Sequence, residues 1–146
     1  MTLDDSFDVA APIERVWPVL CDVPKVAGCM PNATITEVVD DRTYRATVAV
    51  KVGPVSVSYR ATLVIESLDE TTHTATLRVS GDESRGRGGV RATIISKATA
   101  IDGATHIEVH TDAEISGIIA TLGGRLIEGV AKRTTAEFAA NLTNLL

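Results

Sequence analysis

Two histidines near the end of the chain are the residues whose type best suits acid–base or metal chemistry. His106 and His110 alternate with acidic residues at positions 108 and 112. The segment alternates apolar and polar residues with period two, which predicts a β-strand. Residues four apart on a strand are about 13 Å apart, whereas one metal ion needs its ligands at about 2 Å. We therefore expect a solvated strand face and no metal site.

A glycine-rich segment, residues 81–89, has the composition of a phosphate-binding loop. Such a loop requires a helix N-terminus behind it and a Lys-Ser or Lys-Thr pair, and here a strand pattern follows instead. We interpret the segment as a mobile connection between strands. Two other interpretations stay open: a gate over a pocket mouth, and a basic patch of Arg85, Arg87 and Arg91 that contacts a partner protein or lipid head groups.

The remaining reactive residues do not indicate a catalytic centre. Cys21 and Cys29 lack the further cysteines of a zinc site, and no basic residue lies nearer to Cys29 than Lys25 to lower its pKa. We interpret both as reduced structural thiols. No Gly-x-Ser-x-Gly motif or spaced nucleophile, base and acid is present. No catalytic residue is predicted, and Tyr59 is the one conceivable acid of an enzymatic alternative.

The composition is that of a globular domain. The 146 residues are 45% hydrophobic and 23% charged, which indicates neither disorder nor a membrane span. The net charge of −5 argues against nucleic acid as the main partner, because phosphate binding needs a basic face. The acidic residues 1–8 are unlike a secretory leader, so we expect a cytoplasmic protein. Without a linker, repeat or low-complexity tract, we predict one domain over residues 1–146.

The elements that position these residues are mostly strands. Period-two alternation is clearest over residues 44–52, 57–65 and 107–115, and the Gly53-Pro54 step predicts a hairpin turn between the first two. Weaker strand patterns cover residues 3–11, 34–39, 72–80 and 90–100. About seven strands separated by turn-sized gaps predict an antiparallel meander.

Two helices are expected beside these strands. Pro12 suits the first position of a helix that continues through Trp17 and Leu20, and Pro18 should shorten or kink it. Apolar residues over 119–145 recur at helical spacing and predict one helix of about 28 residues, roughly 42 Å long. Strands of roughly 36 Å match that length. The sequence therefore predicts an α+β fold in which a curved antiparallel sheet surrounds a long C-terminal helix.

Small side chains at inward positions favour a cavity between the sheet and this helix. Only 3% of the residues are aromatic. The small inward residues are Ala46, Ala61, Ala92, Gly123, Gly124, Gly129 and Ala131. Empty apolar space costs stability through lost contacts, so either the helix packs closely against the sheet or a ligand fills the space. We favour the ligand and keep close packing as the alternative.

Four segments follow one another along nearly the whole chain in a characteristic order. They are Val16-Trp17 with Leu20 and Asp22, Cys29-Met30-Pro31, Lys51-Val52-Gly53-Pro54-Val55, and Leu122-Gly123-Gly124-Arg125-Leu126-Ile127-Glu128-Gly129. This set resembles CoxG, a family of carbon monoxide dehydrogenase subunits. The resemblance implies the helix-grip fold of the SRPBCC or START-like superfamily, with a deep apolar cavity. Pattern and resemblance together predict this lining: Trp17, Leu20, Met30, Val48, Val50, Val57, Tyr59, Ala61, Leu77, Ala92, Ile94, Val109, Ile119, Leu122, Gly123 and Leu126.

The same resemblance implies a non-catalytic accessory role beside a molybdenum hydroxylase of the carbon monoxide dehydrogenase type. It implies a hydrophobic small molecule, such as a menaquinone-like quinone, as the ligand, with no tightly bound cofactor, and peripheral contact at the inner face of the cell membrane. The sequence departs from the family at Pro18 and in its arginine-rich loop 81–89. The alternatives are a docking or assembly factor that acts through Arg85, Arg87 and Arg91, and a cyclase- or hydrolase-like enzyme.

Overall fold

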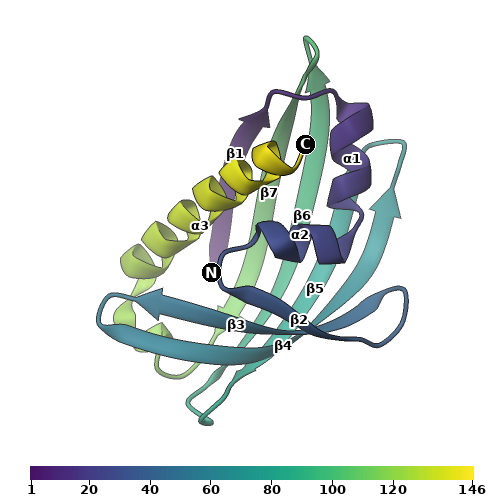
Figure 1. Ribbon diagram of the computed structural model, residues 1–146. Helices are drawn as coiled ribbons and strands as arrows, with labels where there is room; N and C mark the ends of the chain where they lie inside the picture. The colour runs from purple at the N-terminus through teal and green to yellow at the C-terminus, as the bar shows by residue number, and fades with distance from the viewer.

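The computed structural model describes residues 1–146, in which seven antiparallel strands form one curved sheet with helices on its concave side (Figure 1). The elements are β1 Thr2–Val9, α1 Ile13–Leu20, α2 Val23–Cys29, β2 Ala33–Val38, β3 Thr43–Val52, β4 Val55–Asp69, β5 Thr74–Glu83, β6 Gly89–Ile101, β7 Ala104–Ile115, the 3₁₀ turn Ala120–Leu122 and α3 Gly124–Leu145. The strand order is β1-β7-β6-β5-β4-β3-β2. This is the helix-grip fold that the sequence predicted.

The segments with period-two alternation form the strands as expected. β3 and β4 pair in register through Val52 and Val55, around a turn in which Gly53 has a φ of 58°. Inward residues such as Tyr59 and Ala61 are buried, whereas the outward Arg60 between them is exposed. The alternation that predicted the strands therefore also gives the face that each residue occupies.

Two short helices cover one end of the concave face. Pro12 is the N-cap of α1, one position before the predicted place, and the helix ends at Leu20 soon after Pro18. The second helix, α2, has no counterpart among the predicted elements. The Asp22 side chain caps it by accepting a hydrogen bond from the backbone N–H of Lys25 at 3.2 Å. A helix of 7 residues is too short to give a periodic signal.

The C-terminal helix is shorter than predicted. Gly123 adopts a φ of 90° and separates the 3₁₀ turn from α3, which has 22 residues. A positive φ interrupts a helix and is readily available to glycine. The apolar residues recur at helical spacing from Ile119 onward, although the helix itself begins only after Gly123. The spacing alone therefore does not reveal the break at Gly123.

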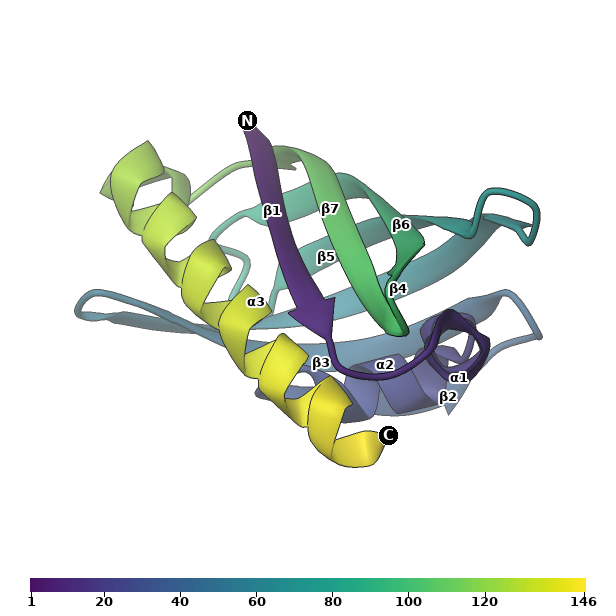
Figure 2. The same cartoon turned by 90° about the horizontal axis from the view of Figure 1, so that it is seen from above.

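Helix α3 lies along the opening between β1 and β3 and also contacts α2 (Figure 2). Its C-terminal turns are anchored, because Leu142 is fully buried and the Asn141 side chain donates a hydrogen bond to the Cys29 carbonyl oxygen at 2.9 Å. The rings of Phe138 and Phe7 meet edge to face at 6.0 Å. The N-terminal turns of α3 are mostly exposed, so the helix closes one end of the concave face more tightly than the other.

The buried core is divided in the same way. A larger cluster under α1 includes Val16, Trp17, Ile107 and Leu142. A smaller cluster at the other end of the concave face consists of Val52, Val57, Tyr59 and Ile119. None of the helices is both long enough and apolar enough to cross a bilayer.

Candidate functional site

A partly open apolar cavity of about 260 Å³ lies between the concave face of the sheet and the N-terminal half of α3. Its lining residues are Val48, Val50, Val52, Tyr59, Ala61, Val79, Gly81, Val90, Ile115, Ile119, Ile127, Val130 and Ala131. A protein cavity of about 150 Å³ is large enough to hold benzene. This cavity therefore has room for an apolar group of about two fused rings.

Small residues on the central strands create this space. Ala61 on β4 pairs in register with Ala46 on β3 and with Gly81 on β5. Three neighbouring inward positions therefore carry nothing larger than a methyl group, and Ala131 on α3 lines the same cavity. Small residues at these positions leave apolar space that a ligand can occupy.

The glycines at the start of α3 do not contribute to the cavity as expected. No atom would lie within 4 Å of a methyl group built on Gly123 or Gly129. A methyl group on Gly124 would meet the Met1 side chain at 3.3 Å, not a residue of the central strands. Gly123 is exposed and is not among the lining residues of this cavity, and its positive φ separates the 3₁₀ turn from α3. Contact between Gly123 and a ligand stays a prediction.

Tyr59 supplies the only hydrogen-bonding side chain of the lining. The residue is 6% exposed, and its hydroxyl group is buried without a hydrogen-bond partner. Burial raises the pKa of Tyr59, and the negative charge of Glu83 raises it further, whereas Arg87 lowers it. The phenol is therefore a protonated potential donor at neutral pH.

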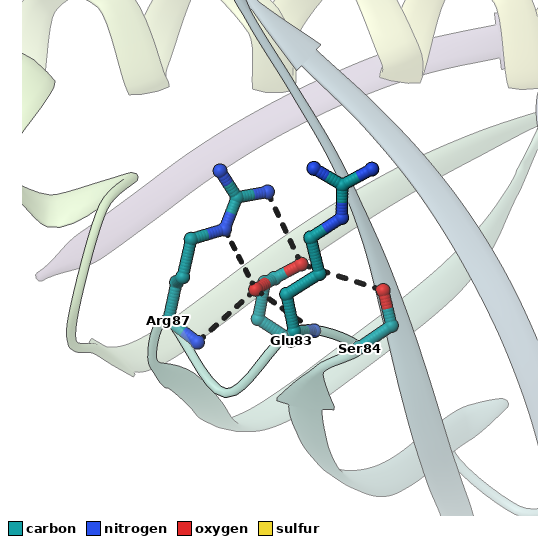
Figure 3. A network of polar contacts seen from close by, with 4 residues as sticks. Glu83, Ser84 and Arg87 are labelled. Carbon is teal, nitrogen blue, oxygen red and sulfur yellow. Dashed lines mark hydrogen bonds and ion pairs between the residues drawn. The ribbon is translucent and has the colours of Figure 1, made fainter.

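Glu83 is the one buried acidic residue, 1% exposed, and faces Tyr59 in register across β4 and β5. Its Oε1 accepts hydrogen bonds from the backbone N–H groups of Arg85 and Arg87, both at 3.1 Å, and from Arg87 Nε at 2.9 Å (Figure 3). Its Oε2 accepts from Arg87 Nη2 and from the Ser84 hydroxyl, both at 3.4 Å. These donors, led by the Arg87 side chain, lower the pKa of Glu83 to about 2.

The basic patch predicted from three arginines is smaller than expected. The guanidinium group of Arg87 pairs with Glu83 through its Nε and Nη2 atoms, which raises the pKa of Arg87. Arg85 and Arg91 are exposed. The backbone N–H groups of Arg85 and Arg87 also donate to Glu83, so these hydrogen bonds hold the loop in one shape. The interpretation of the loop as a mobile connection did not include such contacts.

Close backbone packing joins this loop to the segment that leads into α3. A methyl group on Gly88 would overlap the backbone of Ser116, and one on Gly117 would overlap the carbonyl oxygen of Arg87. That carbonyl oxygen accepts a hydrogen bond from the N–H of Ile118 at 2.9 Å. The glycines of this segment therefore permit two backbones to approach each other.

A comparison with protein families identifies the chain. Residues 6–146 match the family described as a carbon monoxide dehydrogenase subunit (CoxG). The chain belongs to the CoxG family. The match covers almost the whole sequence, and it confirms the resemblance seen in the four motifs. No curated protein sequence matches the chain significantly.

Solved structures support the fold of this CoxG-family chain. A conserved protein from Geobacillus kaustophilus superposes with a TM-score of 0.87 at 24% identity, over 99% of this chain and 93% of that one. The Zhui aromatase/cyclase from Streptomyces sp. R1128 gives 0.67 at 17% identity, over 99% and 92%. A START superfamily protein from Mycobacterium smegmatis gives 0.65 at 15% identity, over 98% and 94%. The likeness to these proteins establishes the START-like fold.

The structure places part of the predicted lining at the cavity of this CoxG-family chain. The predicted residues that border it are Val48, Val50, Tyr59, Ala61 and Ile119. Val57 and Leu122 pack in the cluster next to it. Contact between these residues and a ligand stays a prediction.

The other predicted lining residues lie elsewhere, because α1 and α2 fill much of the concave face. Trp17, Leu20 and Val109 belong to the packed cluster under α1, and Leu77 packs against Val23, Tyr44 and Ile65. Met30 is the C-cap of α2. Ala92 and Ile94 are half-buried on β6 and are not among the lining residues, although Ala92 pairs in register with the lining residue Val79. Gly123 and Leu126 are exposed near the start of α3. These residues lie outside the lining of this cavity, and their contact with a ligand stays a prediction.

Several lining residues were missed although the sequence carries a signal for them. Val52, Val79 and Ile115 lie at inward positions of strands that were predicted, so the alternation already placed them on the correct face. Gly81 continues the inward alternation of β5 just beyond the predicted end of the strand at residue 80. Extending that pattern to the end of β5 would have found Gly81, and also Glu83, which is buried beside Tyr59 but does not line the cavity.

Two larger hollows, of about 830 and 840 Å³, lie on the outer face of the sheet. Their walls carry outward-facing threonine, serine, arginine and acidic side chains, such as Thr62, Arg91 and Glu114. Such a lining keeps its hydrogen bonds to water and gains little by burying an apolar molecule. The smaller apolar cavity is therefore the better candidate site.

The histidines of β7 lie on the outer face and pair with acidic residues. His106 Nδ1 lies 2.7 Å from Asp8 Oδ1, and His110 lies between Asp4 and Asp112. The two carboxylates raise the pKa of His110, Asp4 more strongly than Asp112. These contacts agree with the predicted solvated face, since the histidines pair separately, each with its own carboxylates.

Proposed function

We propose that this CoxG-family chain is a non-catalytic accessory protein that binds a hydrophobic small molecule, a quinone by preference, in the cavity beneath α3. In this proposal it serves a molybdenum hydroxylase of the carbon monoxide dehydrogenase type and links that enzyme to the membrane. The observation that carries the proposal is the apolar cavity of about 260 Å³. The family supports an accessory role, and the START-like fold of its structural neighbours supports a cavity of this kind.

The size of the apolar surface makes binding energetically reasonable. Burying about 300 Å² of apolar ligand surface contributes roughly 7.5 kcal/mol before the costs of association. The cavity lining contributes no charged side chain that would have to lose its hydration. An uncharged apolar molecule therefore gains from leaving water at this site.

Uptake of a short-chain menaquinone tests the proposal. The wild-type chain should retain the quinone through gel filtration, and native mass spectrometry should show one molecule per chain. Ala131→Leu enlarges a lining residue on α3 and should reduce uptake at least about tenfold by filling the space. Ala136→Leu is the matched control, because Ala136 is exposed on the same helix outside the lining. Equal uptake by both variants, or none by the wild type, would contradict the proposal.

Docking to the hydroxylase through exposed arginines is a second candidate function. Arg85 and Arg91 are exposed and form no ion pair in the structure. Reversing both charges, with Arg85→Glu and Arg91→Glu, should weaken co-purification with carbon monoxide dehydrogenase and leave quinone uptake intact. Arg15→Glu on α1, also exposed, is the control. An unchanged yield of the enzyme would count against docking at this surface.

A further inference from the structure

The side chains around the cavity beneath α3 offer a ligand no hydrogen-bond partner. The lining residues are valines, isoleucines, alanines and a glycine, and Tyr59 is the one exception. The hydroxyl oxygen of Tyr59 is itself buried in the protein, so this residue presents the carbon atoms of its ring to the cavity. The wall is therefore almost entirely apolar.

The backbone and the nearest charged residues are also occupied elsewhere. Each strand from β3 to β7 pairs with a neighbour on both sides, so its N–H and C=O groups bond within the sheet. The carboxylate of Glu83 accepts hydrogen bonds from the loop that follows it, including two from the Arg87 side chain (Figure 3). Neither of these two charged residues is part of the lining.

Such a wall discriminates between the two ends of an amphiphilic ligand. A carbonyl oxygen in this cavity would lose its hydrogen bonds to water without replacement, which weakens binding about tenfold for each unpaired oxygen. A hydrocarbon chain gains in proportion to the area that it removes from water. A quinone ring carries a carbonyl oxygen on each of two opposite sides, whereas its prenyl chain carries no polar atom. The cavity therefore favours the chain over the ring.

The size of the cavity sets how much of a chain it can hold. A cavity of about 150 Å³ holds benzene, so the present one of about 260 Å³ holds about ten carbon atoms by the same ratio, or about two isoprene units. The cavity is partly open, so the rest of a longer chain and a polar head can stay outside it.

We infer that the cavity binds the hydrocarbon chain of an amphiphilic ligand over about ten carbon atoms, while the polar head, such as a quinone ring, remains at the opening. This inference rests on the proposed function, because it names the part of the ligand that the cavity accepts. It places the reactive ring of a quinone outside the apolar wall, where its carbonyl oxygens keep their hydrogen bonds to water.

A series of ligands that differ only in chain or ring tests the inference. Competition against radiolabelled menaquinone-2, with gel filtration to separate bound from free label, gives relative dissociation constants for the wild-type chain. From menadione, which has no chain, to menaquinone-2, each prenyl unit should tighten binding at least about tenfold. The third and fourth units should add less than about threefold, because the cavity is full. Menadione should bind at least about tenfold more weakly than 2-methylnaphthalene, which lacks its carbonyl oxygens.

A hydroxyl group introduced into the wall gives a second test. Val50 lines the cavity from β3, and Val50→Thr places a hydroxyl group there. A chain in the cavity would bury this group without a partner, so Val50→Thr should weaken menaquinone-2 binding at least about threefold. Val109→Thr is the matched control, because Val109 is half-buried in the cluster under α1 and outside the lining. Its affinity should stay within about twofold of the wild type, since that cluster makes no contact with the cavity contents.

The outcomes separate this inference from the proposed function. If menadione binds as tightly as menaquinone-2, or if Val50→Thr tightens menaquinone-2 binding, the ring lies inside the cavity; the inference is then wrong while the binding function stands. If the wild type retains the chain hydrocarbon 2,6-dimethylocta-2,6-diene but no menaquinone, the inference stands and the quinone of the proposed function is wrong. If it retains neither, both proposals fail.

Discussion

Filling the cavity from the side of the sheet should stabilise the free protein and prevent ligand uptake. Ala61→Leu adds three carbon atoms at an inward position flanked in register by Ala46 and Gly81. Each buried methylene group contributes about 0.8 kcal/mol, so complete burial of the added carbons would contribute at most about 2.4 kcal/mol. Imperfect packing against the cavity walls reduces this gain.

The expected shift in melting temperature follows from the length of the chain. Unfolding carries an entropy of about 2.1 cal/mol/K per residue, or about 0.31 kcal/mol/K for the 146 residues. One kcal/mol therefore moves the melting temperature by about 3 °C. Ala61→Leu should raise it by about 3 to 8 °C, measured by differential scanning calorimetry. Gel filtration should show that the variant no longer retains the short-chain menaquinone.

Ala75→Leu is the matched control, because it makes the same substitution at an inward position of the neighbouring strand. Ala75 is 5% exposed and belongs to the packed cluster under α1. Extra carbons in a filled core cost about 1 to 3 kcal/mol, so this variant should melt about 3 to 10 °C lower. If Ala61→Leu is destabilised as much as Ala75→Leu and still takes up the menaquinone, the cavity does not exist as described.

Three further substitutions test the contacts around the site and the core. Because the pKa of Glu83 falls from 4.5 to about 2 on folding, its stabilising contribution is complete above about pH 4.5 and is lost as the pH falls toward 2. Urea midpoints measured from pH 6 to pH 3 should therefore fall more steeply for the wild type than for Glu83→Gln, and parallel curves would contradict this reasoning. Thr105→Val removes a hydrogen bond of 2.8 Å to the carbonyl oxygen of Ala11 in a fully buried place and should cost about 1 to 3 kcal/mol in urea unfolding; no measurable loss would mean that the carbonyl finds another donor. Gly117→Ala should lower the melting temperature more than Gly103→Ala, since both glycines have positive φ but only a methyl group at 117 overlaps a neighbouring backbone; equal losses would show that the close approach is unimportant.

The alternation of apolar residues was sufficient to predict the sheet. Residues 44–52 and 57–65 pair as the hairpin β3–β4 that their pattern indicated. The same rule places Glu83 on the inward face, yet a carboxylate there contradicts the expectation of an apolar core. Its burial becomes understandable only from the loop donors that surround it, and those contacts depend on the folded shape of residues 83–87.

The position of the cavity along the concave face could not be predicted from the sequence. Leu77 and Val79 are both inward residues of β5, but only Val79 borders the cavity. The difference arises because α1 and α2 cover one end of the sheet, and α2 is too short to be recognised by periodicity. The break at Gly123 has a similar effect, since it moves the start of α3 and removes Leu122 from the helix.

The location of Trp17 determines how ligand binding can be observed in solution. It is the only tryptophan of the chain, and its ring packs against His73 at a centroid distance of 5.3 Å in the cluster under α1, outside the cavity lining. Its fluorescence therefore reports on the environment of α1 and not on direct contact with a ligand beneath the start of α3. A change in emission on titration would reveal energy transfer to the ligand, inner-filter absorption or a rearrangement of α1.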